Sequence, residues 1–110
     1  MTIVIQNIIP RKQAEAVTTT QYTSSGKTII DKFTATNTSG ATATLTVYLP
    51  PSGGSASNAN CVLFAKPINA GDTYICPEVV GQVLEASGFI ATLAGTASAI
   101  TISASGRIIT

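Results

Sequence analysis

The feature that most constrains the fold is an alternation of small or apolar residues with threonine between Phe33 and Leu49, which reads FTATNTSGATATLTVYL. Successive side chains of a β-strand point to opposite faces, so a period of two predicts strands with one apolar face. The apolar set consists of Phe33, Ala35, Ala41, Ala43, Leu45, Val47 and Leu49. We expect these odd-numbered residues to face a core and the threonines to face outward.

Turn-forming residues recur about every eight to twelve residues along the chain, with β-branched or alternating runs between them. This cadence predicts an all-β fold, a single-domain antiparallel β-sandwich of about eight strands, either jelly-roll-like or immunoglobulin-like. We expect hairpin turns at Asn37–Gly40 and Asn69–Asp72 and a strand over Cys61–Ile68. Pro10–Ala16 is interpreted as one helical turn, because proline is tolerated at a helix start.

The domain organisation predicted from these patterns is simple. Residues 1–16 are interpreted as an N-terminal apolar arm and linker, and residues 17–110 as the β-sandwich domain. A chain of 110 residues buries enough surface to fold without a metal or a disulfide. Pro50–Asn60 is the one low-complexity stretch and is expected to form a long flexible loop.

Charge is scarce in this sequence. Charged residues make up 10% of the chain and the net charge is +1, so the surface must consist largely of neutral small residues. Such a surface favours packing against copies of the chain or against partner proteins. The six basic residues are scattered, which argues against nucleic-acid binding. No apolar run approaches the length of a membrane span, and the apolar N-terminus lacks the basic segment of a signal peptide, so we expect cytoplasmic synthesis.

No reactive constellation is visible. The chain has no histidine, and its acidic residues lie in different segments, so we expect no enzyme activity, no metal, no cofactor and no small-molecule substrate. The alternative is a carbohydrate-binding or adhesion module that uses exposed tyrosines. Tyr22, Tyr48 and Tyr74 each lie within an expected strand, where packing is the commoner role.

Both chain ends are apolar, strand-like and nearly free of charge. The first strand is either an ordinary buried strand or an arm that adds to the sheet of a neighbouring chain. Unguarded strand edges of this kind pair with other chains, so we predict a homo-oligomer or docking onto a larger particle. The candidate interface residues are Ile3, Val4, Ile5, Ile8, Ile9, Pro50, Pro51, Arg107, Ile108 and Ile109.

A family resemblance covers the chain from Val17 to the end. It rests on YTSSGKTIIDKFTATNTSGATATLTVYLPP, on INAGDTYICPEVVGQVLEASGFIATLAG and on the terminal ASGRIIT. In these stretches the chain resembles small β-sandwich accessory structural proteins of tailed bacteriophage virions.

The resemblance implies a virion component present in many copies that decorates the head or forms part of the neck, tail or fibre apparatus. It would be made in the cytoplasm of the host bacterium, and its partners would be itself and other virion proteins. The apolar segment Met1–Pro10 has no counterpart in this pattern.

Overall fold

Nine β-strands and one short 3-10 turn make up the regular structure in a computed structural model that describes residues 1–110. The strands are β1 (Ile3–Gln13), β2 (Thr19–Thr23), β3 (Lys27–Asn37), β4 (Ala43–Tyr48), β5 (Cys61–Ile68), β6 (Thr73–Tyr74), β7 (Val83–Leu84), β8 (Phe89–Ala94) and β9 (Ile100–Ile109). The turn η1 (Asn58–Asn60) lies in the long loop before β5.

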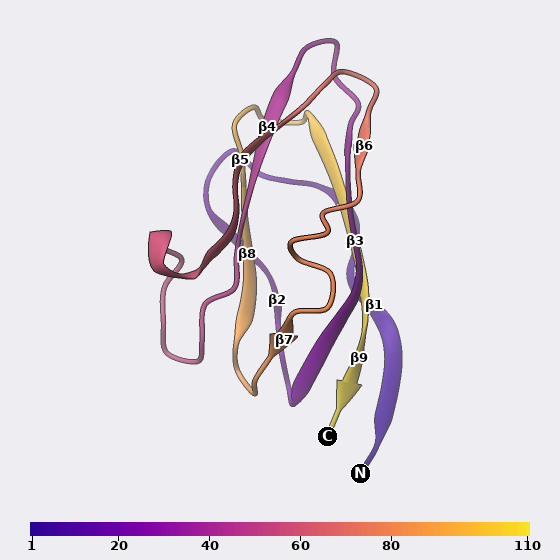
Figure 1. Ribbon diagram of the computed structural model, residues 1–110, viewed down its shortest axis with the longest axis vertical. Coiled ribbons are helices and arrows are strands. Elements are labelled where there is room, and N and C mark those ends of the chain that lie inside the picture. Colours follow the sequence, from indigo (N-terminus) through magenta and orange to yellow (C-terminus); the bar gives the residue numbers. More distant parts are fainter.

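The strands form two antiparallel sheets (Figure 1). The first sheet has the order β1, β9, β3, β6, and β7 also pairs with β3. The second sheet has the order β2, β8, β4, β5. The two chain termini lie at the same end of the molecule, where the backbones of Thr2 and Thr110 exchange two hydrogen bonds of 3.0 Å.

The strand pairs are nested along the chain. β1 pairs with β9, β2 with β8, β3 with both β6 and β7, and β4 with β5. This is the connectivity of a jelly roll, in which one long folded ribbon is wrapped into two facing sheets. The expected all-β sandwich is confirmed, with nine strands because one partner of β3 is divided into β6 and β7.

The core lies between the two sheets and is built by the alternation seen in the sequence. The buried residues of the predicted set are Phe33, Ala35, Ala43, Leu45 and Val47. Leu49 is half-buried, and Ala41 is exposed in the connection between β3 and β4. The predicted parity is therefore confirmed within the strands.

The two expected hairpins are wrong. β3 and β4 lie in different sheets, and so do β5 and β6, so Asn37–Gly40 and Asn69–Asp72 carry the chain from one sheet to the other. Asn37 is fully buried at this corner, and its Nδ2 donates 2.8 Å hydrogen bonds to the carbonyl oxygens of Ala41 and Ile68. A side chain thus satisfies backbone groups that the pairing of two hairpin strands would otherwise satisfy.

The N-terminal segment also differs from expectation. β1 continues through Pro10 to Gln13, so the helical turn expected over Pro10–Ala16 is wrong. Pro10 lies in a β-bulge between Ile9 and Lys12 on an edge strand, a position where a missing N–H breaks no ladder. Most of residues 1–16, interpreted as an arm and linker, is therefore a strand of the first sheet.

The close approach of β9 to β3 leaves no room for a side chain at Gly106. A Cβ at Gly106 in β9 would collide with the carbonyl oxygen of Ile29 in β3. Beside this contact Asp31 forms a bulge in β3, between Ile30 and Lys32. The pairing of β3 with β9 is thus irregular on β3, opposite Ser105 and Gly106.

Candidate interaction surfaces

The free edge of β1 is the first surface that could receive a partner. β1 ends the order of the first sheet and pairs only with β9. Between Thr2 and Ile9 it carries neither a charge nor a proline, the usual guards of an exposed edge. Pro10, Arg11 and Lys12 guard only the second half of the strand.

An apolar patch adjoins this edge on the outward face of the first sheet. Residues paired across strands share a face of the sheet. The exposed pairs here alternate with pairs that face the core, such as Thr28 with Ile108. Two cross-strand rows form the patch: Ile3 with Ile109, and Ile5 with Arg107, Ile29 and Val83. We call these six residues the isoleucine patch, and Lys27, which pairs with Ile109, borders it on β3. Ile3 is 53% exposed and Ile5 is 79% exposed, which is unusual for side chains of this size.

An ion pair joins Arg107 of the isoleucine patch to Asp31 beside it. Arg107 donates to both carboxylate oxygens of Asp31, with 3.0 Å from Nε to Oδ2 and 3.0 Å from Nη2 to Oδ1. The bulge in β3 places Asp31 beside β9 and so makes this forked geometry possible. The carboxylate raises the pKa of Arg107 above its usual value, and both side chains remain partly exposed.

The predicted interface residues divide between the surface and the core. The structure brings Ile3, Ile5, Arg107 and Ile109 together on one face. Ile8, Ile9 and Ile108 are instead buried in the core of their own subunit. Val4 pairs with Ile108 on the inner face and stays partly exposed.

Pro50 and Pro51 do not join this set. Pro50 is buried, and its carbonyl oxygen accepts a hydrogen bond of 3.1 Å from the backbone N–H of Phe89. Pro51 is exposed at the start of the loop that projects beside β5 (Figure 1). Both prolines therefore belong to the second sheet and its loop.

Phe64 is an exposed residue that the sequence reasoning missed. It lies in a bulge of the edge strand β5, where Leu63 pairs with Val47 and Lys66 with Leu45. Ala65 in this bulge has a positive φ of 45°, and Phe64 is 71% exposed. Neither property has a local sequence signal, because CVLFAKPI lacks the glycine that commonly marks a bulge.

The three tyrosines do not form an exposed platform. The Tyr22 hydroxyl is 3.0 Å from Oγ1 of the buried Thr28, and Tyr48 is buried. Tyr74 donates to both carboxylate oxygens of Glu78 at 2.7 Å, and Nζ of Lys66 lies 4.8 Å from the centre of its ring. The hydrogen bond to Glu78 raises the pKa of Tyr74 to about 12 and lowers that of Glu78.

No group of three or more potential metal-ligating side chains comes together in the structure. Both cysteines are free thiols, and Cys76 is buried, which raises its pKa to about 12. A thiol with so high a pKa carries little of the thiolate form that reacts or binds metals. The structure also contains no helix with the length and hydrophobicity needed to cross a bilayer.

Comparison with known proteins gives one informative likeness. No family model matches the chain, and no curated protein matches it. A chain in a solved structure of infectious bursal disease virus, Gx strain, is similar in fold, with a TM-score of 0.51 and 14% sequence identity. The match covers 97% of this chain but 32% of the viral one. The likeness thus shows a shared β-sandwich that forms about a third of a longer viral chain.

Proposed function

We propose that this chain is a non-enzymatic structural subunit of a virus particle, present in many copies and held in place by contacts with copies of itself and with other virion proteins. In finer terms, we propose a component of a tailed bacteriophage, either a head decoration or part of the neck, tail or fibre apparatus. It would be made in the host bacterial cytoplasm and would act in the virion. The resemblance of residues 17–110 to accessory proteins of such virions supports this assignment.

The observation that carries the proposal is that the free edge of β1 adjoins the exposed apolar face of the first sheet. The unguarded half of β1 and the isoleucine patch are continuous, because Ile3 and Ile5 belong to both. A strand of a second chain that pairs with β1 would extend the first sheet and would place further apolar side chains beside the patch. Main-chain hydrogen bonds and apolar burial would then act on the same contact.

A second copy of this chain is the partner that fits best. Arg107 of the patch is paired with the adjoining Asp31 of the same chain, so these two charges are satisfied without a charged partner on the second copy. A two-fold axis at the free edge of β1 pairs this strand with the same strand of the second copy, so that Ile3 and Ile5 of each copy lie beside the apolar half of the other β1. The free edge of β1 and its apolar residues are therefore complementary to themselves.

The scarcity of charge and the fold also support a structural role. A chain in which 10% of the residues are charged has a surface that loses little hydration free energy on assembly. Jelly rolls recur in viral capsid domains, and also in lectins and cupins, so the fold is compatible with the proposal without requiring it. The similar chain in the structure of infectious bursal disease virus is one viral example of such a sandwich.

Sedimentation velocity of the full chain at micromolar concentrations tests the assembly. We expect a concentration-dependent oligomer that the double substitution Ile3→Lys and Ile5→Lys converts to a folded monomer, because charges on an edge strand block pairing. Phe64→Lys is the matched control, since it removes an equally exposed apolar residue from the other sheet's edge strand. A wild-type chain that stays monomeric, or a control that dissociates equally, would contradict the proposed contact.

Peptide mass spectrometry of purified particles of the encoding virus tests the location. We expect the chain in many copies per particle, at a fixed ratio to the other structural proteins. Its absence from particles that are otherwise complete would refute the virion assignment, whatever the oligomeric state.

A further inference from the structure

We propose that a hollow on the outward face of the first sheet binds an anionic polyol, meaning a sugar or sugar alcohol that carries a carboxylate or a phosphate. The hollow has a volume of about 400 Å³, a size that accommodates a small saccharide. Its polar lining includes Asn7, Arg11, Lys32, Thr34, Ser103 and Ser105. We call it the hydroxyl hollow.

Irregular strand geometry surrounds the hydroxyl hollow. β1 has two bulges relative to β9, one between Gln6 and Ile9 and one between Ile9 and Lys12, and these contain Asn7 and Arg11. β3 has its bulge at Asp31, directly before Lys32. Bulges bend a strand and redirect its side chains, and they are frequent beside functional sites. The three bulges in the strands that pair with β9 thus all lie beside the hydroxyl hollow.

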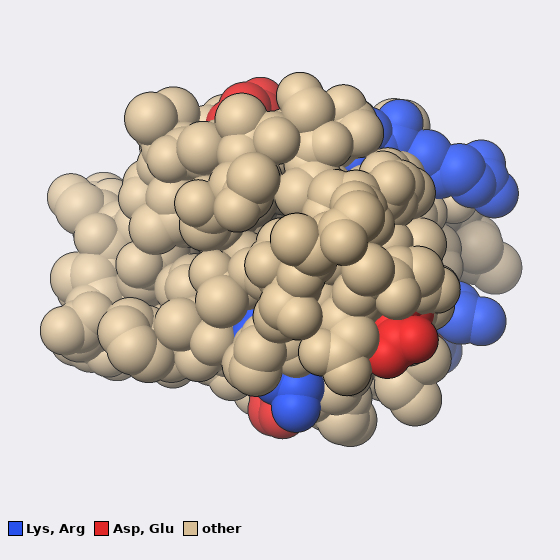
Figure 2. Space-filling model, turned by 90° about the horizontal axis from the view of Figure 1, so that it is seen from above, with Lys and Arg blue, Asp and Glu red and all other residues tan.

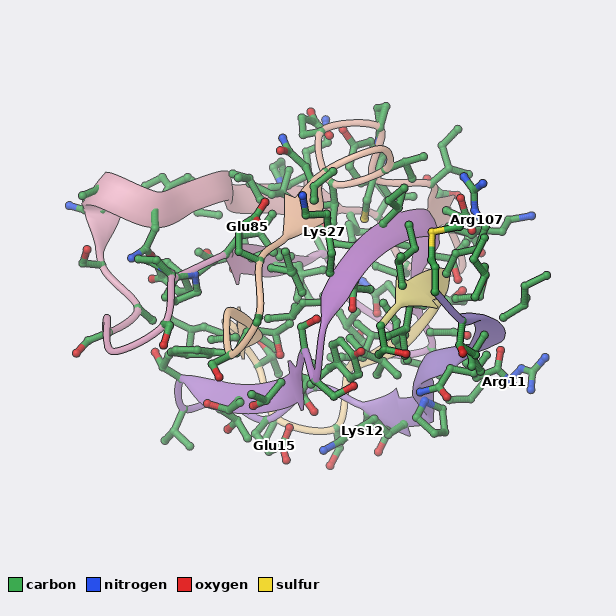
Figure 3. All side chains as sticks on the ribbon, turned by 90° about the horizontal axis from the view of Figure 1, so that it is seen from below. Arg11, Lys12, Glu15, Lys27, Glu85 and Arg107 are labelled. Carbon is green, nitrogen blue, oxygen red and sulfur yellow. The ribbon has the colours of Figure 1, made fainter.

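The basic residues of the hollow are the two that the rest of the chain leaves unpartnered. Of the six Lys and Arg residues, four have partners within the subunit. The partnered ones are Lys12 with Glu15 at 2.9 Å, Lys27 with Glu85 at 3.6 Å, Arg107 with Asp31 at 3.0 Å, and Lys66 over the ring of Tyr74. Arg11 and Lys32 have no such partner, and Figure 3 shows Arg11 away from the labelled acidic side chains.

No acidic residue lines the hydroxyl hollow, so its charge is positive. Asp31 is adjacent to Lys32 in sequence, but its carboxylate is already bound by Arg107 at both oxygens. Two cations without an acidic partner, among the polar side chains that line the hollow, favour a ligand with a small number of negative charges. Two cations are too few for a nucleic-acid backbone, which is bound through many phosphates.

Unused hydroxyl groups give the hollow its second property. Thr34, Ser103 and Ser105 line it, and their hydroxyls make no hydrogen bond within the chain, whereas the hydroxyls of Ser24 and Thr46 do. A hydroxyl both donates and accepts, so a row of them complements the hydroxyls of a polyol. No aromatic side chain lines the hollow, which disfavours a neutral sugar held by stacking.

Calorimetric titration of the full chain with four probes tests this assignment. The probes are trigalacturonate, ribitol 5-phosphate, the neutral maltotriose and inorganic phosphate. We expect saturable binding of trigalacturonate, ribitol 5-phosphate or both, and the probe that binds identifies carboxylate or phosphate as the anionic group. Maltotriose is expected not to bind, and inorganic phosphate is expected to bind at least about tenfold more weakly because it lacks the polyol.

Substitutions locate the binding. Lys32→Gln is expected to weaken it about tenfold, and Thr34→Val about fivefold, by removing a charge-assisted and a neutral hydrogen bond respectively. Lys27→Gln is the matched control, because Lys27 lies on the same strand but is paired with Glu85. The proposal is overturned if neither anionic polyol binds, if maltotriose or phosphate binds as tightly, or if Lys32→Gln leaves the affinity unchanged.

Discussion

The two sheets of this jelly roll differ in the face that each turns away from the core. The strands of the first sheet carry six charged residues, whereas those of the second carry one, Lys66. In the view of Figure 2, charged atoms lie at the right, the lower middle and the upper edge, and the left end of the molecule shows none. The first sheet also exposes the isoleucine patch and the hydroxyl hollow, while the outward face of the second is neutral.

Burial separates the two faces further. On β4, Thr46 points away from the core between Leu45 and Val47, yet it is only 5% exposed. Its Oγ1 accepts a hydrogen bond of 2.9 Å from the backbone N–H of Ala65, so the bulge of β5 lies over it. The second sheet therefore covers part of its outward face with its own chain. The first sheet leaves its outward face open to partners.

The largest expected effect lies on the inward side of the second sheet. Val47→Asp should abolish folding, because an unpaired buried carboxylate costs several kcal/mol and a domain of this kind has about 5–15 kcal/mol to lose. Thr44→Asp, on the other face of β4, should retain the fold. Circular dichroism of the two purified variants checks the expectation, and a folded Val47→Asp variant would contradict the observed register.

Outward positions of the two sheets should respond differently to the same substitution. Thr46→Lys should lower the free energy of unfolding by about 2 kcal/mol, because it buries a charge and removes the acceptor of the Ala65 N–H. Thr34→Lys on the first sheet should change it by no more than about 0.5 kcal/mol. Urea denaturation measures both. Equal losses of unfolding free energy in the two variants would contradict the claim that the second sheet covers its outward face and the first does not.

A smaller effect is expected where the edges of the sheets meet. Lys66 of β5 lies over Tyr74 of β6, and Glu78 accepts the hydrogen bond of Tyr74. Glu78→Gln should return the pKa of Tyr74 from about 12 toward the ordinary value near 10. Because the pKa of Tyr74 is raised in the folded chain, the contact contributes its full stabilisation at pH values below the ordinary tyrosine pKa near 10. That stabilisation is lost as pH rises through about 12.

Ultraviolet difference spectra of the wild-type chain and the Glu78→Gln variant report that titration through the phenolate band. Tyr74→Phe serves as the control, because it removes the phenol in question and identifies its contribution to the band. An unchanged titration in Glu78→Gln would show that the carboxylate does not hold the phenol in solution.

The strands were more predictable from the sequence than their pairing. The parity of Phe33–Leu49 follows from the pleat alone, and the strand Cys61–Ile68 was predicted with its observed bounds. The pairing of the strands was not predictable, because partners such as β1 and β9, or β2 and β8, lie far apart in the sequence. A turn such as Asn37–Gly40 has the same residues whether it joins two paired strands or crosses between sheets.

The candidate surfaces were only partly predictable for the same reason. The apolar run at the N-terminus indicated an interface, but it could not show that Ile3 and Ile5 would be exposed while Ile9 enters the core. The bulge of β1 between Gln6 and Ile9 produces that division, and bulges have no strong local signal. For the same reason, deletion of Met1–Pro10 would remove core residues as well as the edge, so surface substitutions are the better test.

Amide hydrogen exchange of two edge strands, β1 of the first sheet and β5 of the second, tests the assembly contact most directly. Exchange in the peptide Thr2–Ile9 should slow as the protein concentration rises, because a neighbouring chain would protect the free edge of β1. Exchange in Cys61–Ile68 should not depend on concentration, and Ile3→Lys with Ile5→Lys should abolish the protection of β1. Concentration-independent exchange in both strands would contradict the account, as would protection that appears in β5 and not in β1.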